Sequence, residues 1–228
     1  MRLPRTRRRA CAIACALLAL GLGACRDREQ QRATDHRACL QSGELDVGWL
    51  PGTVTHWRAE IERLARQHGL DPDLVAIVVL VESGGGPHAR SGTGALGLMQ
   101  ILPLTGRHIA HERVLGGHSD ERLLESSYNL DLGSWYLARQ TAAFAADDET
   151  RTVERAAAAY NGGPSRLGRH LRGEGTLSAE TERYVGWVGG MWRERHEPRS
   201  PTFEAWWQAG GWRLVRKAEA DLGLDVAD

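Results

Sequence analysis

The pattern of apolar and polar residues divides the chain into three regions. A basic start leads into a short apolar run that ends near Cys25. Residues 26–52 are polar and lack sustained periodicity, which is typical of a tether rather than of a folded domain. Beyond residue 53, apolar residues recur every three or four positions, which predicts a series of amphipathic helices. The sequence therefore predicts one mainly α domain, with no internal repeat.

Two helices are predicted at the start of the folded region. The first carries apolar residues at helical spacing, namely Val54, Trp57, Ile61 and Leu64. Gly69 is a typical helix stop, and the second helix then begins with Asp71 as N-cap and Pro72 at the first helical position. Its segment "LVAIVVLV" is apolar on every side, which predicts a buried helix. Because the segment is rich in β-branched residues, a buried strand is the alternative.

The rest of the folded region alternates glycine-rich breaks with helical patterns. The segment "ALGLMQIL", between Ser91 and Pro103, predicts a small β-hairpin or an extended loop. Helices are predicted over 126–144, where Gly133 indicates close helix packing, over 153–161, and from about Ser178. The tail after Pro198 predicts one or two helices that pack back on the core, and its aromatic residues are Phe203, Trp206, Trp207 and Trp212.

The N-terminal segment is typical of a secretory signal that is removed before folding. Its apolar run of roughly a dozen residues is too short to span a membrane comfortably. The sequence "LGAC" resembles the lipobox of bacterial lipoproteins, which implies that Cys25 carries lipid and becomes the new N-terminus. Because Arg26 follows the cysteine, the resemblance implies an outer-membrane anchor facing the periplasm. The alternative is an ordinary signal peptide and a soluble periplasmic protein, in which Cys25 and Cys39 could form a disulfide.

Charge excludes one class of partner once the signal is removed. The 228 residues include 29 basic and 29 acidic side chains, but five arginines precede residue 10 and no acidic residue does. The remaining chain therefore has 29 − 5 = 24 basic residues against 29 acidic ones. A mildly acidic protein is a poor candidate for binding nucleic acid.

Glu82 is the first candidate for chemistry, because it ends the apolar helix. The negative end of the helix dipole and the surrounding apolar side chains both raise the pKa of a carboxyl group at that position. A carboxylic acid that is protonated near neutral pH suits general acid catalysis of glycosidic cleavage. From its position alone, Glu82 is better explained as the first solvated residue after a buried helix.

Several short motifs occur in an order that resembles a known family. They are "ES" at 82–83, Ser91, "GALGLMQILP" at 94–103, "YNLDLGSWYL" at 128–137, "AAYNGGPSRL" at 158–167 and "ETERYV" at 180–185. Together, over roughly residues 54–192, they resemble the soluble lytic transglycosylase family, glycoside hydrolase family 23. The resemblance implies a lysozyme-like fold with a small β-hairpin beside the active-site groove. The chain then divides into a signal peptide (1–24), a lipid-anchored tether (25–52), a lytic transglycosylase domain (53–195) and a Trp-rich C-terminal extension that packs on that domain (196–228).

The same resemblance implies roles for individual residues. Glu82 matches the single catalytic acid/base, and the implied substrate-binding residues are Ser91, Gly97, Gln100, Tyr160 and Asn161. Taken without the family, Tyr160 is explained as a core aromatic and Gln100 as a solvent-facing residue. One departure concerns Gly85, which occupies the place of an aromatic residue in the family pattern. We therefore expect the local support for the acid, or one edge of the sugar groove, to be looser than in relatives.

The implied reaction cleaves the bond between N-acetylmuramic acid (MurNAc) and N-acetylglucosamine (GlcNAc) in peptidoglycan and leaves 1,6-anhydro-MurNAc ends, without metal or cofactor. The histidines at 88, 108, 111 and 118 fit no compact ligand pattern and are interpreted as surface residues. Candidate second carboxylates by sequence are Asp120, Glu121 and Asp131, and none lies in a motif that positions it opposite Glu82.

The expected partners of a monomer are glycan strands, the membrane through the lipid anchor, and other envelope proteins. Two alternative functions stay open. One is a goose-type lysozyme, in which water replaces the muramoyl 6-hydroxyl as the attacking group. The other is a non-catalytic peptidoglycan-binding lipoprotein.

Overall fold

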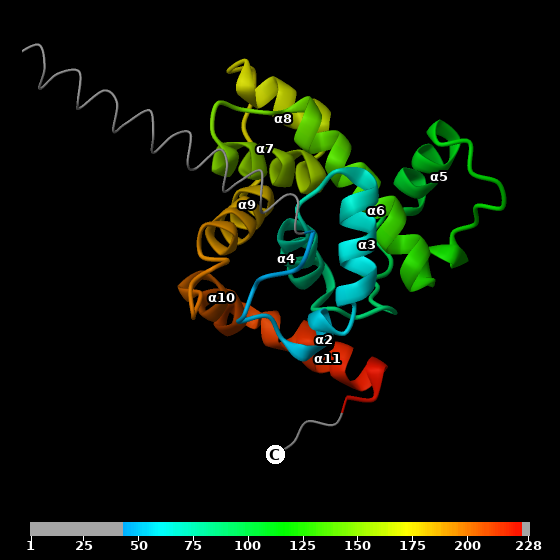
Figure 1. Cartoon of the computed structure of the whole chain (residues 1–228). Coiled ribbons are helices and arrows are strands. Elements are labelled where there is room, and N and C mark those ends of the chain that lie inside the picture. Colours follow the sequence, from blue (N-terminus) through cyan, green and yellow to red (C-terminus); the bar gives the residue numbers. More distant parts are fainter. Residues whose placement is uncertain (1–42, 225–228) are drawn as a thin grey trace, which may run out of the picture. The chain divides into compact units, whose positions relative to one another are not determined.

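The structure, a computed structural model, describes residues 43–224 and is built from helices joined by short loops (Figure 1). The predicted signal peptide, Cys25 and Cys39 lie outside the described residues. In chain order the helices are α2 (Gly52–Thr55), α3 (Arg58–His68), α4 (Pro72–Ser83), α5 (Pro103–Glu112), the 3₁₀ turn η1 (Glu121–Leu124), α6 (Ser126–Ala143), α7 (Glu149–Gly162), α8 (Pro164–Leu171), α9 (Ala179–Arg193), α10 (Pro201–Trp206), the π-helical turn η2 (Trp207–Gly211) and α11 (Trp212–Leu222). The predicted mainly α class is confirmed.

Helix α4 lies at the centre of the domain, between α3, α9 and α11 (Figure 1). The Asp71 side chain accepts a hydrogen bond of 2.8 Å from the backbone N–H of Asp73, and Pro72 occupies the first turn as predicted. Every residue from Leu74 to Leu80 is buried, so the segment is a core helix and the strand alternative is wrong. Gly84 ends the helix with a left-handed backbone (φ 63°).

The segment between α4 and α5 forms a loop. Residues 43–224 contain no β-strand, and the backbone pairing of the loop consists of two isolated antiparallel bridges, Arg90 to Leu96 and Leu96 to Ile101. The predicted β-hairpin is therefore not confirmed. The buried Asn129 of α6 holds the loop, because its Nδ2 donates to the carbonyl of Leu96 at 2.8 Å and its Oδ1 accepts from the N–H of Met99 at 2.8 Å.

Glycines allow close packing, although not always against the partner that the sequence indicates. A Cβ on Gly133 would lie 2.4 Å from the sulfur of Met99, so this glycine of α6 admits a loop side chain rather than another helix. Gly189 of α9 has the role that was predicted for Gly133, close packing of two helices. A Cβ on Gly189 would lie 2.7 Å from Cγ of Glu154 on α7. Helices α7 and α9 accordingly pack along one another.

The segment before α2 differs from the predicted tether. Leu45, Val47 and Leu50 are all buried in the main hydrophobic core. The N–H of Asp46 also donates to Oδ1 of Asp73 on α4 at 2.8 Å. Residues 43–52 therefore belong to the folded domain, because an apolar residue at every second or third position provides enough buried area to hold them there.

The C-terminal helices return to the core, α10 against α9 and α11 beside α2 and α4 (Figure 1). Trp206 of α10 is buried, and Val215 and Ala218 are the buried residues of α11. Gly210 has a φ of 116°, a backbone conformation that favours glycine, and it marks the kink between α10 and α11. Among the residues that the structure describes, no helix is both long and apolar enough to cross a membrane.

Candidate active site

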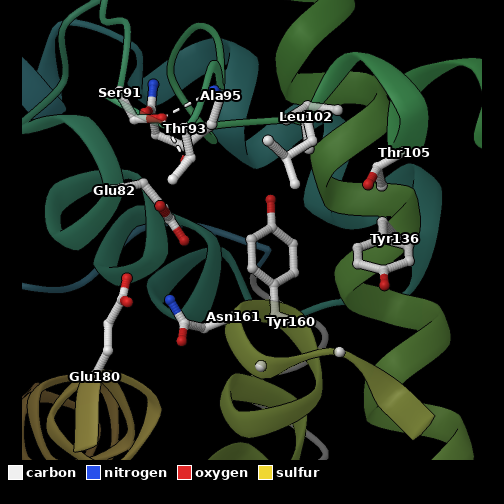
Figure 2. A pocket seen from close by; sticks show the side chains of 14 residues that line it. Glu82, Ser91, Thr93, Ala95, Leu102, Thr105, Tyr136, Tyr160, Asn161 and Glu180 are labelled. Carbon is white, nitrogen blue, oxygen red and sulfur yellow. Dashed lines mark hydrogen bonds between the residues drawn. The ribbon is translucent and has the colours of Figure 1, made fainter. Parts of the chain in front are cut away.

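Glu82 lines a cavity of about 400 Å³ at the C-terminal end of α4. The walls come from the loop before α5, from α6, from the junction of α7 and α8, and from the first turn of α9 (Figure 2). The lining residues are Glu82, Ser91, Thr93, Ala95, Gln100, Ile101, Leu102, Thr105, Tyr136, Tyr160, Asn161, Gly162, Gly163 and Glu180. The fold thus brings together residues nearly one hundred positions apart.

The environment of Glu82 favours the neutral acid. The residue keeps partial exposure towards the cavity, but protein atoms surround its carboxyl group. Burial raises the pKa of Glu82 from its usual value near 4.5 to about 8, and the negative charge of Glu180 acts in the same direction. At neutral pH Glu82 therefore holds a proton that it can give to a bound molecule.

Two residues of α9 lie close to Glu82, and the sequence analysis assigned a site role to neither. Glu180 points towards Glu82 across the cavity (Figure 2). The Tyr184 hydroxyl, one turn later on α9, lowers the pKa of Glu82, but this effect is smaller than the increase caused by burial. The same hydroxyl makes no hydrogen bond of normal geometry. The signal was present in "ETERYV", since residues four apart share one face of a helix.

Tyr160 and Asn161, at the end of α7, both line the cavity as the resemblance implied. The Tyr160 hydroxyl donates a hydrogen bond of 2.8 Å to the carbonyl of Met99, and its ring lies beside Tyr136. The Asn161 carbonyl oxygen accepts from the hydroxyl of Thr181 at 2.9 Å, and its amide nitrogen points towards Glu82 (Figure 2). An amide N–H donor and the acid therefore face the same space.

The loop between α4 and α5 contributes Ser91 and Gln100 to the cavity. The Ser91 hydroxyl accepts from the N–H of Ala95 at 2.9 Å and lies 2.9 Å from the hydroxyl of Thr93. The Gln100 amide nitrogen donates within the loop, to the carbonyls of Ala89 and Gly97, so its oxygen is the atom left to accept from a ligand. Gln100 has a left-handed backbone (φ 47°), which is uncommon for a residue with a side chain.

Gly97 does not line this cavity, although the resemblance implied that its backbone contacts sugar. Its φ is 76°, and a Cβ there would lie 2.4 Å from both Nδ2 of Asn129 and the carbonyl oxygen of Leu123. Gly97 is therefore required for the loop to pack against Asn129 and η1. Its effect on the cavity is indirect, because the same loop carries Ser91 and Gln100.

The glycines after Glu82 are tightly packed rather than loosely supported. A Cβ on Gly84 would lie 2.6 Å from the backbone nitrogen of Val215, and one on Gly85 would lie 2.4 Å from the carbonyl oxygen of Thr53. The Thr53 hydroxyl donates to the carbonyl of Gly84 at 2.6 Å, and the Trp57 indole N–H donates to that of Gly85 at 2.9 Å. The expectation of looser support is wrong, because α2 and α11 occupy the space beside this loop.

The carboxylates that the sequence suggested as partners for Glu82 lie elsewhere. Asp131 is paired with His68 and Arg113, and Asp120 with Arg107, while Glu121 is fully exposed in η1. None of the three lines the cavity. Within residues 43–224, no group of three or more His, Cys, Asp or Glu side chains is arranged to hold a metal ion.

Proteins of known activity resemble parts of this chain. Membrane-bound lytic murein transglycosylase C of Actinobacillus pleuropneumoniae serotype 5b is 38% identical over 80 residues, which are 34% of this chain and 22% of that protein. Endo-type membrane-bound lytic murein transglycosylase A of Klebsiella pneumoniae is 33% identical over 84 residues, 36% of this chain and 41% of that protein. The matched segments thus span about a fifth to two fifths of these relatives.

A solved structure has a similar fold. It is that of an inactive glutamate-to-glutamine mutant of lytic transglycosylase Slt from Pseudomonas aeruginosa, with a TM-score of 0.53 and 27% sequence identity. The likeness covers 65% of this chain and 25% of that one.

Residues 60–182 match the family described as Transglycosylase SLT domain. The matched segment is more than half of the 228 residues and contains Glu82 and the other cavity residues that the motifs supplied. This match agrees with the resemblance that the motifs indicate. The chain therefore belongs to the Transglycosylase SLT domain family.

Proposed function

We propose that this protein is a peptidoglycan lytic transglycosylase, with Glu82 as its single acid/base. The observation that carries the proposal is the position of the Glu82 carboxyl group, which lines a cavity at the end of a buried helix, where burial raises its pKa to about 8. Family membership and the names of the relatives support the reaction type. The substrate would be the glycan strand, cleaved between MurNAc and GlcNAc.

In the first step, Glu82 gives its proton to the oxygen that links the two sugars. The bond between that oxygen and the anomeric carbon of MurNAc breaks, and the acetamido oxygen of the same sugar bonds to the anomeric carbon. The GlcNAc side leaves as an alcohol, which carries the proton from Glu82. This step needs a neutral acid at the working pH, and burial of Glu82 provides one.

In the second step, the ionised Glu82 removes the proton of the muramoyl 6-hydroxyl. That oxygen attacks the anomeric carbon and displaces the acetamido oxygen, which forms the 1,6-anhydro ring and restores the protonated acid. No water is consumed. Because nucleophile and electrophile belong to one sugar, the attack is intramolecular, and the protein needs to supply little beyond proton transfer and orientation.

The other cavity residues would hold the sugars. Asn161 presents an amide N–H and Gln100 an amide oxygen, which match the carbonyl and N–H of an N-acetyl group. The Tyr160 hydroxyl, which donates its proton to the Met99 carbonyl, would keep its oxygen lone pairs for a substrate donor. Ser91 and Thr93 line the same wall and offer hydroxyl groups to the sugar ring.

Glu180 favours one alternative, hydrolysis by a goose-type lysozyme mechanism. A second carboxylate across the cavity is the residue that an inverting hydrolase would use to activate water. The products distinguish the two reactions, because anhydro ends lack one water relative to reducing ends. Mass analysis of digested peptidoglycan should show anhydro-MurNAc ends; reducing MurNAc ends in their place would favour the lysozyme.

Replacement of Glu82 by Gln tests the proposed acid. We expect the rate of cleavage of purified sacculi to fall by about 10³-fold, because glutamine cannot exchange the proton. The fold should survive. Because folding raises the pKa of Glu82, ionisation of this residue favours the unfolded chain above pH 4.5. Glutamine does not ionise, so the variant lacks this destabilising contribution. The melting temperature at pH 7 should therefore equal or exceed that of the parent, and parental activity in the variant would refute the assignment.

We further propose that the protein is a lipoprotein of the cell envelope that faces the periplasm. The lipobox at Leu22–Cys25 is the sequence basis of this proposal. The relatives named as membrane-bound lytic murein transglycosylases support the location.

A further inference from the structure

The side of α9 that borders the active-site cavity continues into a second hollow. Arg183 and Trp187 follow Glu180 by three and seven residues, so the three side chains lie along one side of the helix. The second hollow has a volume of about 450 Å³. Its lining residues are Arg183, Gly186 and Trp187 of α9 with Pro201, Thr202 and Ala205 of α10.

The walls of this hollow are held firmly together. A Cβ on Gly190 would lie 2.5 Å from the Thr202 hydroxyl, so this glycine lets α10 approach α9. Glu194, which caps α9, accepts hydrogen bonds from the Ser200 hydroxyl at 2.5 Å and from the Thr202 N–H at 2.9 Å. The hollow is therefore a fixed feature of the fold. All of its lining residues follow residue 182, where the family match ends.

The chemistry of the hollow suits an anionic group joined to an apolar one. Arg183 is exposed and takes part in none of the ion pairs found among residues 43–224. Trp187 is half-buried and offers an apolar surface beside it. An arginine side chain presents a fork of N–H donors that matches the geometry of a carboxylate.

Peptidoglycan carries its carboxylates on the peptide stems and not on the sugars. In a stem-bearing strand the lactyl group of each MurNAc is an amide, so the glycan itself is uncharged. Seven residues of helix separate Glu180 from Trp187, a rise of about 10 Å. A stem of four residues spans up to about 14 Å when extended. A stem attached to a muramoyl group in the catalytic cavity can therefore reach the hollow.

We propose that this second hollow, between α9 and α10, binds the acidic peptide stem of the substrate, with Arg183 on a stem carboxylate and Trp187 against an apolar part of the peptide. The proposal rests on the proposed function, since it assumes that peptidoglycan occupies the neighbouring cavity. It assigns to the C-terminal extension a part in substrate selection.

Direct binding tests the site without any need for catalysis. The probe is the free stem tetrapeptide, titrated by calorimetry into the Glu82→Gln form of the 228-residue chain. Adding Arg183→Ala should weaken binding about tenfold, and Arg183→Lys, which keeps the charge, should restore part of it. Arg169→Ala on α8 is the matched control, because Arg169 is likewise exposed and takes part in no ion pair among the described residues. Equal affinity for Arg183→Ala and its parent would overturn the proposal.

Kinetics separates failure of this site from failure of the proposed function. Strands that keep their stems are compared with strands whose stems have been removed by an amidase. In otherwise parental protein, Arg183→Ala should raise KM about fivefold on the first substrate only, with kcat unchanged. An equal change on both substrates, or on neither, contradicts stem binding. If the parent cleaves neither substrate, the proposed function fails, while the calorimetric result on the stem peptide still stands.

Discussion

At the scale of single residues, the pKa of Glu82 depends on neighbours from two helices, α4 and α9. The apolar residues of α4 predicted its burial correctly, since they precede it directly in sequence. Glu180 and Tyr184 are about one hundred residues away, and they reach Glu82 only because α9 packs against α4. Local sequence could therefore predict the burial of Glu82 but not the groups that tune its pKa.

The pH dependence of cleavage follows from this environment. The acid is active while protonated, so kcat/KM should fall as pH rises through about 8. Because the charge of Glu180 raises the pKa of Glu82, the variant Glu180→Gln should move this alkaline limb to lower pH. Glu182→Gln is the matched control, since Glu182 is exposed, lies two positions along α9 and does not line the cavity. An alkaline limb at the same pH in Glu180→Gln and the parent would show that Glu180 does not act on the acid.

At the scale of elements, the loop after α4 shows why a departure from the family pattern need not weaken a site. The sequence shows Gly85 in place of an aromatic residue, but it does not show what fills the space. The structure places the backbone of α2 against Gly85 and that of α11 against Gly84. Both contacts join distant segments, so no local pattern could have predicted them.

The substitution Gly85→Ala should destabilise the protein more than a positive φ alone explains. Gly85 and Gly94 share a φ of 87°, but only Gly85 has a backbone atom, the Thr53 carbonyl oxygen at 2.4 Å, in the path of a Cβ. Gly94→Ala should therefore cost about 1–2 kcal/mol for its backbone conformation alone. Gly85→Ala should cost a further 1–3 kcal/mol, roughly the penalty of overpacking. Chemical denaturation measures both values, and equal losses would show that α2 yields to the added methyl group.

At the scale of the whole molecule, the elements outside the family match complete the domain. The match begins at residue 60 and ends at 182, whereas the loop after Glu82 also packs against Thr53, Trp57 and Val215. The sequence correctly predicted a helical C-terminal tail but placed the start of the domain too late. The predicted tether, residues 25–52, is polar as a whole and includes Leu45, Val47 and Leu50. Only the burial of these three side chains shows that they belong to the core.

The earlier start of the domain shortens the tether that a lipid anchor would have. Residues 26–42, fully extended, reach at most about 60 Å, which would restrict cleavage to glycan near the membrane. Cys25→Ser should therefore release the protein from the membrane fraction into the soluble periplasmic fraction. Its kcat/KM on solubilised strands should stay within about twofold of the parent's, because the cavity lies wholly within residues 82–180. Cys39→Ser, which leaves the lipobox intact, should stay with the membrane. A Cys25→Ser protein that remained in the membrane fraction would contradict the lipoprotein proposal, because no other residue of the lipobox can carry the lipid.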